Sequence, residues 1–158
     1  MEEKRSAADA FESFRQVVEK LRSGEGCPWD RAQTMESLKP CMVNEMTETL
    51  AGIDLYGQTG DAANLCEELG DVLLLVMLQA QIAQEKGLFD IADVIEGVRS
   101  KMVRRHPHVF PEEAQPGAPT DWQSIKREEK KSRMPAQEAA EKKAFQEAAG
   151  WTIRHLQS

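Results

Sequence analysis

A chain of 158 residues has the length of one domain, and its 41% hydrophobic and 30% charged residues suit a buried core rather than a disordered chain. The net charge of −7 argues against nucleic acids and anionic membranes as partners, because both attract basic surfaces. The longest apolar run, residues 72–78, is far shorter than the roughly 18 residues of a membrane span. The N-terminal residues lack the apolar segment of a signal peptide, and the three cysteines form no CxxC pair. We therefore expect a cytoplasmic protein with reduced thiols.

The periodicity of the chain is helical nearly throughout, and no stretch alternates convincingly like a strand. Ser6 is predicted to cap a first helix, in which apolar residues recur every three or four positions and so form a stripe along one side. Residues 23–30 are rich in turn-forming residues and predict a break. A second helix is expected to begin between residues 34 and 40 and to run to about Tyr56.

The next two helices are delimited by glycine, proline and capping residues. Residues 57–60 are predicted to form a turn, and Asp61 to cap a third helix that ends near Gly87. Asp90 is predicted to cap a fourth helix, which runs to about Arg105 and is stopped by a proline.

The last third begins with a proline-rich segment, residues 107–119, which predicts a loop. Thr120 with Gln123 resembles a capping box that opens a fifth helix. Residues 135–149 are rich in Ala and Glu and favour a helix by propensity. The predicted fold class is therefore all-α, a helical bundle.

The third helix is apolar nearly all round in its second half, from Leu69 to Ala80. A helix without a polar face must be surrounded by other helices or lie in a subunit interface. Because one chain offers only four long helices to enclose it, we expect a homodimer or a higher homo-oligomer.

Two acidic pairs interrupt the apolar arcs of the second and third helices: Glu45 with Glu48, and Glu68 with Asp71. The i, i+3 spacing directs each pair from one face of its helix. The turn between the helices makes them antiparallel neighbours, so the pairs can face each other. Carboxylates in apolar surroundings are costly unless they meet cations or hydrogen-bond donors.

Four converging carboxylates need protons or a metal ion, and a hard divalent ion suits an all-oxygen ligand set. Mg²⁺ fits best, with Mn²⁺ as a possible substitute. A di-iron bundle requires Glu-x-x-His pairs, and His106, His108 and His155 all lie outside these helices. A solvated acidic face, the usual role of an ExxE pair, remains the alternative.

Cationic and aromatic side chains complete the set of candidate residues. Lys101 and Arg105 share one face of the fourth helix, from which they are expected to reach phosphate oxygens. The alternative is that they only stabilise the helix, because the helix dipole favours positive charge at a C-terminus. Trp29 and Trp122 are candidates for stacking on a nucleobase, although packing is the more common role of a tryptophan.

Five ordered segments of the chain resemble the MazG nucleoside triphosphate pyrophosphohydrolases over residues 10–131. These segments are Gly26-Cys-Pro-Trp-Asp-Arg-Ala-Gln-Thr34, Asn44-Glu-Met-Thr-Glu48, Glu67-Glu-Leu-Gly-Asp71, Lys101-Met-Val-Arg-Arg-His-Pro-His-Val-Phe110 and Trp122-Gln-Ser-Ile-Lys-Arg-Glu-Glu-Lys130. We therefore expect a MazG-like domain over residues 1–133, followed by a helical C-terminal extension over residues 134–158.

The resemblance implies the all-α NTP pyrophosphatase fold, assembled as dimers or larger oligomers. It also implies Mg²⁺-dependent hydrolysis of a nucleoside triphosphate to the monophosphate and pyrophosphate, a nucleotide-pool housekeeping reaction. The family's metal motif falls on four carboxylates of this chain: Glu45, Glu48, Glu68 and Asp71. Glu45 or Glu48 is the expected general base. Family phosphate-binding positions match Lys101 and Arg105, and Trp29 and Trp122 match aromatics of the base pocket.

Four positions depart from the family pattern, among them Met46 and Thr47, which replace the Ala and Tyr often seen in the second helix. Asn44 replaces the first Glu of the metal motif, and Met35 replaces the usual His after Gln-Thr. One alternative is therefore a catalytically weakened, nucleotide-binding regulatory protein, and another is a purely structural helical oligomer. The sequence does not distinguish ribonucleotides from deoxyribonucleotides, or standard from damaged bases.

Overall fold

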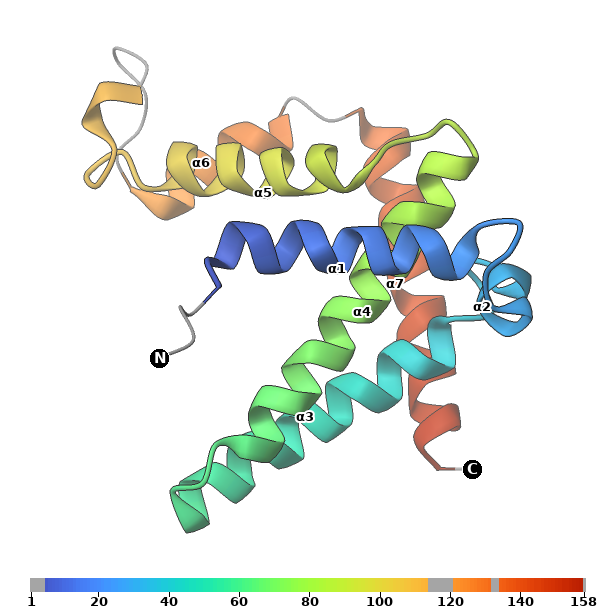
Figure 1. Ribbon diagram of the computed structural model, residues 1–158. Helices are drawn as coiled ribbons and strands as arrows, with labels where there is room; N and C mark the ends of the chain where they lie inside the picture. Colours follow the sequence, from blue (N-terminus) through green and yellow to red (C-terminus); the bar gives the residue numbers. More distant parts are fainter. Residues whose placement is uncertain (1–4, 114–120, 132–133, 158) are drawn as a thin grey trace. The chain divides into compact units, whose positions relative to one another are not determined.

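The computed structural model describes residues 5–113, 121–131 and 134–157, and it confirms the all-α fold class. Over these residues the chain forms helices without strands (Figure 1). The elements are α1 (Ala7–Arg22), α2 (Pro28–Ala32), α3 (Lys39–Thr59), α4 (Ala63–Glu85), α5 (Ile91–Arg105), a short 3₁₀ turn (Pro111–Glu113), α6 (Trp122–Lys131) and α7 (Pro135–Leu156). None of the described helices has both the length and the apolar character needed to cross a membrane.

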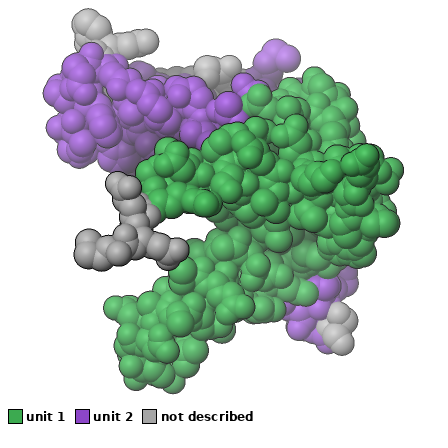
Figure 2. Space-filling model, in the orientation of Figure 1, with its two compact units in different colours: residues 1–91 green, residues 92–158 purple. Residues whose placement is uncertain are grey.

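The chain divides into two compact units, coloured separately in Figure 2. The first covers Met1–Ile91 and contains α1 to α4, and the second covers Ala92–Ser158 and contains nearly all of α5 together with α6 and α7. The predicted boundary between residues 133 and 134 stays a prediction.

Helix α1 begins as predicted. Ser6 is its N-cap, and its Oγ accepts a hydrogen bond from the backbone N–H of Asp9 at 3.1 Å. Val18 lies in the core of the first unit, and Phe11 and Phe14 pack against that core from the same helix. The apolar stripe of α1 therefore faces inward.

The segment after α1 contains a helix that the sequence analysis placed in a break. Pro28 starts the five-residue helix α2, since proline lacks only an N–H that the first turn leaves unpaired. The side chain of Arg22 is almost fully buried and fixes α2 by donating hydrogen bonds to the backbone carbonyls of Asp30 and Gln33. The same guanidinium also donates to the Glu85 carboxylate of α4 at 2.6 Å. Gly26 is required in the connection, because a Cβ there would lie 2.2 Å from the carbonyl oxygen of Leu21.

Helices α3 and α4 pack against each other as a hairpin. Helix α3 continues to Thr59, three residues beyond the predicted end, so Gly57 lies within the helix rather than in the turn. Within this turn, Gly60 takes the left-handed conformation, with φ of 73°. The predicted cap is displaced by one residue. Ala62 occupies the N-cap position of α4, while Asp61 Oδ1 accepts a hydrogen bond from the N–H of Ala63 at 2.9 Å.

The core of the first unit is built on the second half of α4, as its apolar sequence predicted. One buried cluster joins four residues of α4 to α1 and to the segment before α3: Leu75, Met77, Leu78 and Ile82, with Val18 and Leu38. Met35 and Cys41 are half-buried against the cluster. Leu69 and Leu73, which belong to the same apolar stretch, are instead exposed in the single chain.

The second unit confirms the fourth helix, which runs from Ile91 to Arg105. Thr120, predicted to open the next helix with a capping box, lies outside the described residues. Asp121 accepts a hydrogen bond through Oδ1 from the N–H of Ser124 at 2.9 Å, and so performs a capping role at the start of α6. The predicted helix at residues 135–149 forms and extends to Leu156 as α7.

Candidate functional site

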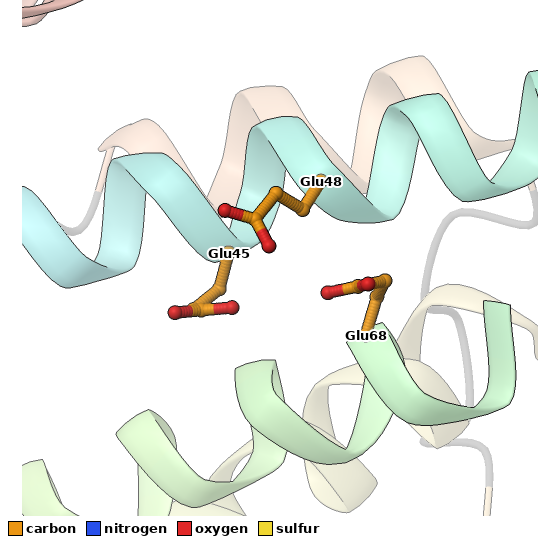
Figure 3. A group of neighbouring side chains, drawn as sticks. All are labelled: Glu45, Glu48 and Glu68. Carbon is orange, nitrogen blue, oxygen red and sulfur yellow. The ribbon is translucent and has the colours of Figure 1, made fainter. Parts of the chain in front are cut away.

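Three of the four predicted carboxylates lie together between α3 and α4. Glu45 and Glu48 project from α3 and Glu68 from α4, and their carboxylates point toward one another (Figure 3). One carboxylate oxygen from each lies within 4.8 Å of the others. Glu45 and Glu48 therefore face Glu68 across the hairpin, as their helical faces predicted.

Burial increases from Glu48, which is exposed, through Glu45 to Glu68, which is only 8% exposed. The pKa of Glu45 is raised above its usual range, mainly because burial disfavours its charged form and also because the charges of Glu48, Asp71 and Glu68 repel it. The site is thus a region of crowded negative charge.

Asp71 lies one turn after Glu68 on α4 and is half-buried. Its charge contributes to the raised pKa of Glu45, so it faces the same region of the hairpin. It is not part of the group whose oxygens lie within 4.8 Å of one another among the described residues. Its role as a fourth ligand stays a prediction.

Polar contacts fix the hairpin beside the carboxylates. The buried hydroxyl of Thr49 donates to the backbone carbonyl of Glu45 at 2.8 Å and lies 3.4 Å from that of Glu68. The side-chain amide of Asn64 donates to Glu68 Oε1 at 2.8 Å. Gly52 is buried where α3 meets the backbone of α4 at Leu65.

The donor set suits a hard divalent cation. Mg²⁺ takes oxygen ligands at about 2.0–2.1 Å, which puts two ligands on opposite sides of one ion about 4.2 Å apart. Three ligands cannot all lie opposite one another, so at least two of the three separations must shorten from within 4.8 Å to the roughly 3 Å of adjacent ligands when the side chains close on an ion. Among the residues that the structure describes, Glu45, Glu48 and Glu68 are therefore the group that suits such an ion.

The predicted phosphate-binding residues lie on α5, in the second unit. Lys101 is exposed. Arg105 is half-buried, and its guanidinium carbon lies 4.9 Å from the centre of the Trp122 ring. Trp122 is the first residue of α6 and is 39% exposed. Arg105 and Trp122 thus form one cationic and aromatic surface within this unit.

Glu129, which the sequence analysis did not single out, holds this surface in place. It accepts hydrogen bonds from Arg105 at 2.6 Å and from Arg104 at 2.7 Å. The guanidinium groups, that of Arg105 first, lower the pKa of Glu129 to about 2. No local signal predicts this contact, because the partners are 24 and 25 residues apart.

Trp29 lies on α2 in the first unit and is 58% exposed, so its ring is available to a ligand. Met35 and Asn44, two of the departures from the family pattern, have different surroundings. Met35 packs against the apolar core, and its backbone carbonyl accepts a hydrogen bond from Gln79 at 3.1 Å. Asn44 is exposed on α3, one residue before Glu45.

The comparison with known proteins agrees with this geometry. Residues 33–110 match the model of the MazG nucleotide pyrophosphohydrolase domain. The chain belongs to the MazG family. The matched residues include the four predicted metal ligands of the MazG motif as well as Lys101 and Arg105, whereas Trp29 and Trp122 lie outside them.

Individual members of the MazG family are similar over most of this chain. A nucleoside triphosphate pyrophosphohydrolase/pyrophosphatase MazG of Thermotoga maritima is 48% identical over 127 residues, which are 80% of this chain and 48% of that protein. A nucleoside triphosphate pyrophosphohydrolase of Escherichia coli K12 is 38% identical over 118 residues, 72% of this chain and 43% of that protein. The uncharacterized protein YabN of Bacillus subtilis is 46% identical over 123 residues, 76% of this chain and 24% of that protein. The chain thus spans about half the length, or less, of these curated relatives.

Proposed function

We propose that this chain hydrolyses nucleoside triphosphates to nucleoside monophosphates and pyrophosphate, as a nucleotide-pool housekeeping enzyme that depends on Mg²⁺ and accepts Mn²⁺ as a substitute. The observation that supports this most strongly is the convergence of three carboxylates from α3 and α4 in a chain of the MazG family. The names of the Thermotoga maritima and Escherichia coli relatives give this activity for those proteins.

The acidic residues have two roles in this proposal. Glu45, Glu48, Glu68 and Asp71 hold the cation, which when bound neutralises charge on the phosphate oxygens. Glu45 or Glu48 also accepts a proton from the water that attacks the α-phosphorus, and the bond from that phosphorus to the bridging oxygen of pyrophosphate breaks.

The cationic and aromatic residues bind the substrate in this proposal. Lys101 and Arg105 donate hydrogen bonds to phosphate oxygens and stabilise the departing pyrophosphate, and a guanidinium suits this because it presents paired donors. Trp29 and Trp122 stack on the base. Both rings are partly exposed, which such stacking requires.

We also propose that two or more copies of the chain associate through the apolar outer sides of the hairpin. Five large apolar side chains of α3 and α4 are exposed on these sides: Met46, Leu50, Ile53, Leu69 and Leu73. We call this set the apolar edge. On each helix its members lie on the side opposite the acidic pair, so the members on α3 and those on α4 face away from each other, and a second copy can cover either group without covering the carboxylates.

A panel of ribo- and deoxyribonucleoside triphosphates with Mg²⁺, assayed for pyrophosphate release, tests the reaction and its substrate preference together. Release of pyrophosphate with an equal amount of nucleoside monophosphate supports the proposed enzyme. Thermal stabilisation by a nucleotide without release would replace it with the nucleotide-binding regulator. If neither response occurred, the structural oligomer would be the better interpretation.

A further inference from the structure

Asn64 lies one turn before Glu68 on α4, and its side chain is oriented by two neighbours. Its Nδ2 donates a hydrogen bond to Glu68 Oε1 at 2.8 Å. A carboxylate only accepts hydrogen bonds, so the amide nitrogen must face Glu68 and the amide oxygen must point elsewhere. That oxygen faces α3, where it lies 3.1 Å from the position that a Cβ on Gly52 would take.

Gly52 provides the space in which the Asn64 amide lies. A side chain at this position would also come within 3.3 Å of the Cα of Leu65, which belongs to the backbone of α4. Any larger residue would therefore displace Asn64 or push the helices apart. Gly57, in the same helix, has nothing within 4 Å of its own Cβ position. In α3, glycine is thus required at position 52, where the helix contacts Asn64, and not at position 57.

The buried Glu68 carboxylate needs such a partner because it lies beside two other negative charges. Repulsion from Glu45 and Glu48 favours rotamers that turn Glu68 away from them, and a glutamate side chain has many rotamers available. The hydroxyl of Thr49, which also lies between the helices, is directed at backbone carbonyls. The amide of Asn64 acts on the carboxylate itself.

We propose that Asn64 is a positioning residue, which holds Glu68 toward Glu45 and Glu48 so that the three carboxylates are arranged for a divalent cation before it binds, and that Gly52 permits this arrangement. The inference rests on the proposed function, since it names the residues that orient a ligand of that metal site. Hydrogen bonds that orient metal ligands typically change metal affinity by 10- to 100-fold when removed.

Binding of Mn²⁺ to the full chain without nucleotide, followed by electron paramagnetic resonance, tests this directly. Asn64→Ala is expected to weaken Mn²⁺ binding by about 10-fold or more. Gln84→Ala, which removes an exposed amide from the same helix, is expected to leave the affinity within about 2-fold. Asn64→Gln, which retains the amide one carbon further from the backbone, is expected to recover part of the loss.

A second arm uses the two glycines of α3. Gly52→Ala is expected to weaken Mn²⁺ binding because it displaces the Asn64 amide, whereas Gly57→Ala is expected to leave the affinity unchanged. In turnover assays, Asn64→Ala is expected to raise the Mg²⁺ concentration for half-maximal rate while kcat at saturating Mg²⁺ changes little. A residue that only stabilised the fold would lower the unfolding temperature without changing the Mn²⁺ affinity of the folded protein.

The outcomes separate this inference from the proposed function. If the wild-type chain binds Mn²⁺ and Asn64→Ala binds it equally well, Asn64 has no positioning role and the metal site stands. If the wild-type chain binds no Mn²⁺ at millimolar concentration, the metal site itself is wrong and the role of Asn64 fails with it.

Discussion

Replacing Glu45 with Gln removes one negative charge from the group that Glu45, Glu48 and Glu68 form between α3 and α4. In the absence of a divalent cation this substitution is expected to stabilise the protein, because it relieves repulsion that burial strengthens. The raised pKa of Glu45 has the same two causes, burial first and the neighbouring carboxylates second.

The size of the effect follows from the separation of the oxygens. Two unit charges 4.8 Å apart repel by about 3.5 kcal/mol at an effective dielectric constant of 20, and by about 1 kcal/mol in bulk water. Glu45 is half-buried and Glu48 is exposed, so water screens much of the repulsion. We therefore expect Glu45→Gln to raise the free energy of unfolding by about 1 kcal/mol in EDTA, which corresponds to about 2–4 °C in the unfolding temperature of a chain of this size.

Mg²⁺ is expected to reverse this order of stability. A cation that binds the folded chain at 100 times its Kd adds about 2.7 kcal/mol to the free energy of unfolding. Wild type should gain this stabilisation, and Glu45→Gln should gain much less because it has lost a ligand. Thermal unfolding followed by circular dichroism, in EDTA and in Mg²⁺, measures both effects.

The matched control is Glu67→Gln, which removes an exposed carboxylate from α4 next to Glu68. It should respond to Mg²⁺ as wild type does. The reasoning is refuted if Glu45→Gln is no more stable than wild type in EDTA, or if Mg²⁺ stabilises the two proteins equally.

Three further predictions concern the rest of the chain. The pKa of the Glu129 carboxyl, measured by NMR titration, should be about 2, and it should move toward the ordinary value of 4.5 in Arg105→Ala. Because the pKa is lowered in the folded state, the ion pairs of Glu129 stabilise the fold above pH 4.5, and this stabilisation is lost as the pH falls toward 2. Leu78→Ala, at a core side chain that is 2% exposed, should lower the free energy of unfolding by about 2–5 kcal/mol in urea titrations, and a loss under 1 kcal/mol would contradict the described core. Leu50→Glu, on the apolar edge at 60% exposure, should shift the sedimentation of the protein toward the monomer, and an unchanged oligomer would remove that edge from the interface.

The hairpin and its acidic face were predictable because helical geometry alone decides which residues share a face. Glu45 and Glu48 are one turn apart, as are Glu68 and Asp71, and both pairs interrupt apolar arcs. The burial of Glu68 followed from the same pattern. The alternation of helices and breaks then fixed the order of α1, α3, α4 and α5.

Features held by distant contacts were less predictable. Helix α2 is too short to show a period, and the buried guanidinium of Arg22 fixes its backbone. Gly57 was predicted to lie in the turn because glycine is a poor helix former. A glycine inside a helix destabilises it by only about 1 kcal/mol relative to alanine, which is small beside the stabilisation that a long helix gains from packing. The contact of Glu129 with Arg105 depends on how α5 and α6 pack, which local sequence does not encode.

Asn64 was within reach of sequence reasoning and was overlooked. Its i, i+4 spacing to Glu68 is typical of side-chain hydrogen bonds on a helix. The role of Gly52 was not accessible in the same way, because it depends on the approach of two helix backbones. The apolar character of α4 predicted that the stretch from Leu69 to Ala80 is surrounded; the structure buries its later part, while Leu69 and Leu73 in the same stretch are exposed in the single chain.

The most direct test of the account is to locate the cation in crystals of the protein grown with Mn²⁺ and a non-hydrolysable nucleoside triphosphate. Anomalous scattering from Mn²⁺ is expected to place the ion between α3 and α4, with oxygens of Glu45, Glu48 and Glu68 as ligands. Mn²⁺ bound at any other place, with these three carboxylates directed into solvent, would contradict the claim that the hairpin is the metal site.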